Sequence, residues 1–114
     1  MESILTSVKK LLGIAEEDEN FDTDIIFHIN AVFMTLTQLG VGPSKGFSIS
    51  DEMTTWRDFV SEDHALYGSL PTYMYAKVKL IFDPPLSSAV IEALNRTIAE
   101  FEWRLNVVAE TPTT

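Results

Sequence analysis

Apolar residues recur at steps of three and four along most of the chain, which is the spacing of one face of an α-helix. The first such run predicts a helix over residues 3–12, with Ser3 as its N-cap and Gly13 at its C-terminal end. Five polar residues follow at positions 16–20, and four of them are acidic. Because like charges repel, this segment is predicted to be a solvated connector.

The second apolar run predicts a longer helix that begins at Asp22, its expected cap, and is ended by Gly40. Phe21 and Ile26 have the spacing of a hydrophobic staple. The expected core stripe consists of Ile25, Ile29, Val32, Leu36 and Leu39. Further apolar residues widen the surface beyond what one face of a small monomer buries, namely Ile26, Phe27, Phe33 and Met34. The helix is therefore either central in the fold or in contact with another subunit.

Residues 40–50 contain three glycines and a proline, which interrupt both helical and strand periodicity and predict a long loop. Loops of this length are uncommon in compact domains and often carry function. The loop is therefore a candidate for contact with a partner, and simple flexibility is the alternative interpretation.

Two more helices follow this loop. Ser50 is the expected cap of a short helix in which Met53, Trp56, Phe59 and Val60 have helical spacing. Pro71 is suited to the first turn of another helix, and Asp83-Pro84-Pro85 ends that helix.

The last apolar run predicts the longest helix, over residues 87–108, with Ser87 as its cap and Leu86 and Ile91 as its staple. Its core face is expected to contain Val90 or Ile91, Leu94, Ile98, Phe101, Leu105 and Val108. A second, narrower apolar stripe of Ala99, Trp103 and Val107 is not needed by that core face, so it is a candidate interface. Residues 109–114 are expected to form a flexible polar tail.

Together these elements predict an all-α fold: a small bundle of about four to five helices in one domain over residues 1–108. The composition, 46% hydrophobic and 22% charged, is that of an ordinary globular protein. Glu2 stands where a signal peptide carries positive charge, and no apolar run approaches the roughly 20 residues of a membrane span, so a soluble protein without a leader is expected.

The net charge of −9 opposes nucleic-acid binding, which depends on neutralising phosphates with basic residues. The chain has no cysteine, which excludes disulfides, thiolate chemistry and cysteine-based zinc sites. A calcium loop starting at Asp18 would need glycine where Thr23 stands and glutamate where Ile29 stands. His28 and His64 are isolated on different elements. We therefore predict no catalytic, cofactor or metal site, and a protein that is not an enzyme.

Four segments resemble a known family in their order and spacing. These are Ile29-Asn30-Ala31-Val32-Phe33 running to Leu39-Gly40-Val41, Trp56 with Phe59, Phe82-Asp83-Pro84-Pro85 with Ser87-Ser88, and Glu102-Trp103-Arg104-Leu105-Asn106. Over nearly its whole length the chain resembles the small helical head–tail connector (adaptor, or head-completion) proteins of tailed bacteriophages.

The resemblance implies a structural, non-enzymatic virion protein of the phage neck, made in the host cytoplasm. It implies a homo-oligomeric ring of about twelve copies that binds the portal protein, continues the DNA channel to a stopper or tail-completion protein, and lets DNA pass without specific binding. In such adaptors a loop can approach the lumen, which here would involve Val41, Lys45 and Phe47. The C-terminal segment reaches towards the portal, which would involve Asn106, Glu110 and Thr114. The candidate subunit or partner interface is Phe27, Phe33, Met34, Ala99, Trp103 and Val107.

The charge is compatible with this interpretation, because about twelve copies at −9 give a ring of about −108, and acidic walls repel DNA so that it slides without sticking. The alternative is an acidic DNA mimic or regulatory protein that acts on a host nucleic-acid-binding protein. Such a mimic requires carboxylates at duplex phosphate spacing, and the acids here are bunched at 16–24 and 51–63.

Overall fold

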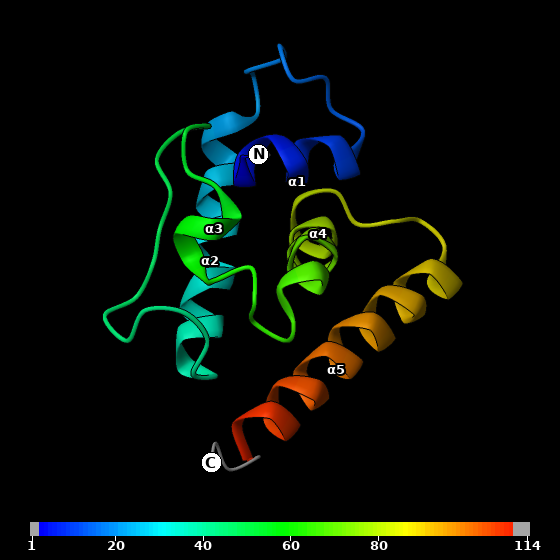
Figure 1. Ribbon diagram of the computed structural model, residues 1–114. Coiled ribbons are helices and arrows are strands. Elements are labelled where there is room, and N and C mark those ends of the chain that lie inside the picture. Colours follow the sequence, from blue (N-terminus) through cyan, green and yellow to red (C-terminus); the bar gives the residue numbers. More distant parts are fainter. Residues whose placement is uncertain (1–2, 111–114) are drawn as a thin grey trace.

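A central helix organises the molecule. The computed structural model describes residues 3–110. Three helices pack against the central helix α4 (Leu70–Phe82), namely α1 (Ile4–Leu12), α2 (Asp22–Gln38) and α5 (Ser88–Glu110) (Figure 1). Between α2 and α4 the chain forms a long loop, the four-residue helix α3 (Trp56–Phe59) and a single 3₁₀ turn. The described residues contain no β-strand, so the predicted all-α class, with its long C-terminal helix and long loop after α2, is confirmed.

Local capping signals set the ends of α1 as predicted. The Thr6 amide donates to Ser3 Oγ at 2.8 Å, and Gly13 ends the helix with φ at 80°, a left-handed conformation that glycine adopts without steric cost.

The predicted cap of α2 is wrong. Phe21 occupies the N-cap position and makes no side-chain cap, whereas Asp22 is the first helical residue. The Asp22 carboxylate instead forms an ion pair with Lys9 of α1, with Nζ–Oδ1 at 2.8 Å. Phe21 is exposed and packs edge-on against Phe82 of α4, with ring centroids 5.7 Å apart. Tertiary contacts therefore fix the start of this helix.

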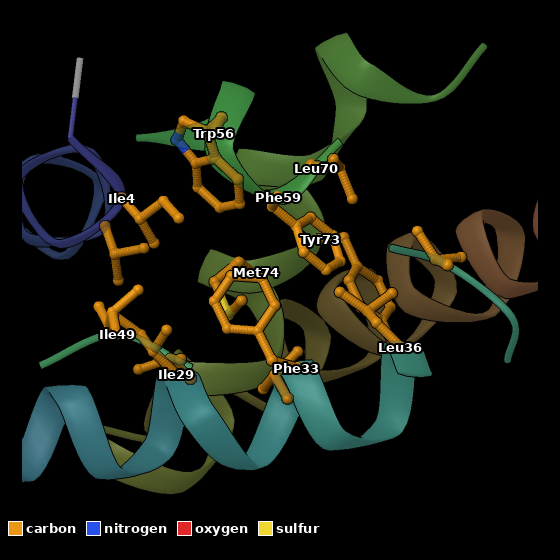
Figure 2. Packing of buried hydrophobic residues seen from close by; sticks show 14 of the residues in the cluster. Ile4, Ile29, Phe33, Leu36, Ile49, Trp56, Phe59, Leu70, Tyr73 and Met74 are labelled. Atoms are coloured by element: carbon orange, nitrogen blue, oxygen red, sulfur yellow. The ribbon is translucent and has the colours of Figure 1, made fainter. Parts of the chain in front are cut away.

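The core contains residues from all five helices and from the long loop, and Figure 2 shows Ile29, Phe33 and Leu36 rising from α2 into it. Ile25, Ile29, Val32 and Leu36 are buried as expected, and Leu39 is only half-buried. The core cluster includes Ile4, Leu5, Val8, Ile25, Ile29, Val32, Phe33, Leu36, Val41, Ile49, Trp56, Phe59, Leu70, Tyr73, Met74, Val78, Phe101 and Leu105.

The loop after α2 folds back over that helix. Asn30 holds it with two hydrogen bonds: its Nδ2 donates to the Ile49 carbonyl at 2.9 Å, and the Ile49 amide donates to its Oδ1 at 2.8 Å. Gly42 has φ at 83° and passes directly over the Phe59 ring, where a Cβ atom would lie only 2.3 Å from Cε1. The loop predicted over 40–50 is present, and it is anchored to α2 at Ile49.

The cap predicted for the third helix is also wrong. Thr55, not Ser50, precedes α3, and the Thr55 amide donates to the Asp58 carboxylate at 2.8 Å in a capping box. The helix is short as expected, but Met53 lies outside it and is exposed. Trp56 is buried, and its Nε1 donates to Ser7 Oγ of α1 at 2.8 Å.

The last two helices begin and end close to their predicted limits. Pro71 lies in the first turn of α4, and Pro84 and Pro85 follow its end. The amide of Ile91 donates to the Ser87 carbonyl at 3.1 Å at the start of α5, which runs to Glu110, two residues past the expected end. Leu86 is fully exposed, so the predicted staple does not form.

Only the C-terminal half of α5 is well packed. Phe101 and Leu105 are buried, and the Phe101 ring stacks on Tyr73 of α4 with centroids 4.3 Å apart. Of the other expected core residues, Ile91, Leu94 and Ile98 are half-buried and Val90 is exposed. Val108 was also expected in the core, but its side chain is not among those that the structure describes. With α4 as its main neighbour, α5 leaves its opposite face to solvent.

Candidate assembly surfaces

Large apolar side chains are exposed on the outer face of α2. Phe27 and Met34 expose 71% and 65% of their surface, although most apolar residues of this helix are buried. Ala31 lies between them at helical spacing and is also exposed. Exposed apolar side chains that form a contiguous patch mark interaction sites more often than singly scattered ones do.

This face of α2 forms one wall of an open groove of about 790 Å³, which we call the α2 groove. The other wall is the returning loop. Lys45 is the only charged residue among those that line it, and none of them is acidic. The lining residues are Phe27, Asn30, Ala31, Met34, Thr37, Gln38, Ser44, Lys45, Gly46, Phe47 and Ser48.

A second apolar surface, which we call the α5 ridge, lies on the outer face of α5. Ala99, Trp103 and Val107 are spaced four residues apart and are all exposed, with Trp103 exposing 65% of its surface. Glu100, one turn before Trp103, pairs with Arg104 at 2.6 Å. The buried face of the same helix, with Phe101 and Leu105, packs towards α4, so the ridge points away from the core.

The structure places some of the predicted site residues together on one surface and others on a separate surface. Phe27, Met34, Lys45 and Phe47, which come from two predicted groups, line one groove. Ala99, Trp103 and Val107 form the separate α5 ridge. Asn106 is exposed on α5, Glu110 is the last residue of that helix, and Thr114 lies outside the described residues.

Phe33 is fully buried, so its assignment to an interface was wrong. Its ring lies 4.6 Å from that of Phe59 and 4.9 Å from that of Phe47, measured between centroids. The α3 segment and the loop cover this position, which helical spacing alone places beside Met34. Val41, at the start of the same loop, is buried in the core cluster and so does not face a lumen or a partner.

Sequence reasoning missed Asn30, which positions the groove wall through its two bonds to Ile49. A polar residue directly after the core residue Ile29 was the available signal, but its bonding partner lies 19 residues away. Ala31 was missed as well, because a single alanine at an exposed helical position carries no distinctive pattern.

Metal-binding side chains do not cluster within residues 3–110. No group of three histidine or acidic residues in this part of the chain could hold a metal ion. Burial raises the pKa of Tyr73 well above its usual value, and so does the nearby Glu102 carboxylate, which accepts a hydrogen bond from the Tyr73 hydroxyl at 2.9 Å. None of the described helices has the length and apolarity needed to cross a membrane.

An acidic all-α protein with two exposed apolar helix surfaces has the features of a subunit that functions by assembling with other proteins. Comparison with known families supports this class. A family described as "Phage connector protein" matches residues 4–112, so the chain belongs to the phage connector family, a family of structural, non-enzymatic proteins. The protein has a head–tail connector role in a tailed phage, associates with portal and tail proteins, and is located at the virion neck. Searches of curated proteins and of solved structures gave no match.

Proposed function

We propose that this protein is the adaptor subunit of the phage neck, forming a homo-oligomeric ring of about twelve copies between the portal and the stopper or tail. The observation that carries the proposal is the presence of two separate apolar surfaces, the α2 groove and the α5 ridge, on helices that pack against α4 without being principal neighbours of each other. A subunit with two different contact surfaces associates head to tail, and such contacts form a closed ring when the rotation closes.

The charge of the chain supports a channel that DNA crosses without binding. With a charge of −9 per copy, the ring presents an acidic field that repels the phosphate backbone. The acidic connector at residues 16–20 is largely exposed, and Asp51 and Glu52 in the long loop are exposed too. These residues are free to face the lumen or solvent, whereas the groove is lined by no acid.

The C-terminal end of α5 is the proposed portal contact. Asn106 is exposed near that end, Glu110 is its last residue, and the chain continues to Thr114. The loop residues Lys45 and Phe47 are proposed to contact a partner, because they line the groove beside Phe27 and Met34.

The test is reconstitution with the portal protein of the same phage. Purified protein is added to portal rings, and negative-stain images are compared with those of portal alone. A ring of extra density coaxial with the portal channel is expected, and a variant lacking residues 111–114 should bind the portal more weakly than the full chain. Absence of any density on the portal, together with recovery of a host nucleic-acid-binding protein from infected cells, would favour the acidic-mimic alternative.

A further inference from the structure

We propose that the α5 ridge of one copy docks into the α2 groove of the next copy, with Trp103 entering between Phe27, Met34 and Phe47. This assignment rests on the ring proposed above and specifies its subunit contact. Both surfaces belong to the same chain, and Figure 1 shows α2 and α5 on different sides of α4. Occupying the groove therefore leaves the ridge of the same copy available for another neighbour.

The two surfaces have complementary shapes. The groove is a hollow of about 790 Å³ between a helix and a loop. The ridge carries one large aromatic side chain, Trp103, with the small Ala99 one turn before it, which lets the backbone of α5 approach the opposing wall. Buried aromatic anchors surrounded by smaller apolar contacts are typical of the most strongly contributing residues of interfaces.

The charges favour this pairing over the symmetric ones. Lys45 is exposed on the groove wall and has no ion pair with a described residue. Glu100 lies on the ridge one turn before Trp103 and pairs with Arg104. Its side chain is still 61% exposed, so its carboxylate can accept a further hydrogen bond from Lys45 of the next copy. A groove-to-groove contact would instead face lysine with lysine and hollow with hollow.

The contact also keeps acidic surfaces apart. Each copy carries −9, so two copies repel unless they meet where acids are few. The groove lining contains one positive charge and no negative one, which makes it a favourable place for a second acidic copy to bind. By contrast, a groove between α4 and α5 and another beside Phe82 are each lined by at least one acidic residue.

The absence of cysteine allows a clean cross-linking test. Ala31 lies in the groove and Ala99 on the ridge, both exposed and both small, so Ala31→Cys and Ala99→Cys perturb the fold little. The two single variants are mixed, treated with a short bismaleimide, and analysed by denaturing electrophoresis and mass spectrometry. A control mixture pairs Ala99→Cys with Ala15→Cys, which is exposed before the acidic connector.

A product joining positions 31 and 99 is expected in the mixture, at least tenfold above the 15–99 control, and neither single variant should form homodimers. Adding Trp103→Ala to the Ala99→Cys chain should lower the yield about tenfold. A 31–31 or 99–99 product, or equal yields with the control, would overturn the assignment.

Running the reaction with and without portal rings separates this assignment from the proposed function. If a ring forms on the portal but the cross-link between positions 31 and 99 does not, the ridge-in-groove contact is wrong and the adaptor role is supported. The 31–99 product without portal binding keeps the contact and argues against the adaptor role. If the protein neither cross-links nor binds the portal, both are wrong.

Discussion

The buried lysine between α1 and α2 provides the sharpest test of how the fold is held together. The Lys9 side chain is only 3% exposed, and its Nζ pairs with the Asp22 carboxylate at 2.8 Å. The same ammonium donates to the Glu16 carbonyl at 2.9 Å and to the Asp18 carbonyl at 2.7 Å. One side chain therefore fixes the acidic connector and the first turn of α2. Lys9→Met retains most of the apolar stem and removes all three interactions.

The expected cost is large on the scale of protein stability. Removing one partner of a buried ion pair costs about 3–5 kcal/mol, because the remaining charge is left buried without compensation. Asp22 keeps access to solvent, with 21% of its side chain exposed, which places the estimate at the lower end of that range, about 3 kcal/mol. For a domain of this size that corresponds to a fall in melting temperature of about 12 °C.

Thermal and urea unfolding followed by circular dichroism measure this cost. Lys10→Met is the matched control, because Lys10 is the next residue of the same helix and is exposed. The double variant Lys9→Met/Asp22→Asn should recover part of the loss, since it removes the orphaned charge. If Lys9→Met lay within about 0.5 kcal/mol of wild type, or if the Lys10 control lost as much, the buried lysine would not hold the connector.

Three other predictions follow from the structure. Trp103→Ala should change the free energy of unfolding by no more than about 0.5 kcal/mol. It should weaken self-association about 100-fold, because covering its roughly 130 Å² of exposed surface contributes about 3 kcal/mol to the contact. Unchanged oligomers in mass photometry, together with a much lower melting temperature, would instead show that Trp103 supports folding and not assembly. Asn30→Ala leaves the amide and carbonyl of Ile49 unpaired, so it should cost about 2–3 kcal/mol and speed limited proteolysis within residues 40–50, and an unchanged cleavage rate would contradict the anchor. Tyr73→Phe should cost about 1 kcal/mol at neutral pH. The pKa of Tyr73 in the folded state lies above the unfolded value of about 10, so the stability that this side chain contributes is present below pH 10 and is lost as the pH rises above it. In urea titrations, the difference in unfolding free energy between Tyr73→Phe and wild type should therefore become smaller above pH 10.

The ends of helices could be predicted where the signal is local. Ser3, Gly13, Pro71 and Ser87 act through neighbouring backbone groups or through their own dihedral angles, so the sequence around them contains the information that is needed. Asp22 met the same local rule but bonds to another helix. Among the described residues, the Asp22 carboxylate is the only negatively charged group that pairs with the buried ammonium of Lys9. Neutralising this ammonium stabilises the fold more than a helix cap would, so Asp22 bonds to Lys9 instead of capping α2.

The same distinction explains which candidate interface residues lie on the surface of the subunit and which are buried. On α5 the ridge could be predicted, because a helix with one principal neighbour buries one face and exposes the other. On α2 the sequence could not separate Phe33 from Met34, since both lie beside the core stripe. The choice between them depends on the loop returning over Phe33, and that return depends on a hydrogen-bonded pair 19 residues apart.

The loop over residues 40–50 contributes both to the core and to the proposed contact surface. The charge that would keep copies apart acts over roughly 8 Å at physiological ionic strength, so acids beyond that distance from a contact oppose it only weakly. The residues that line the α2 groove include no acid, so in the proposed contact no carboxylate of this lining faces the next copy. The Asn30 bonds to Ile49 link the two properties, because they hold the loop that both covers the core at Phe33 and forms a wall of the groove.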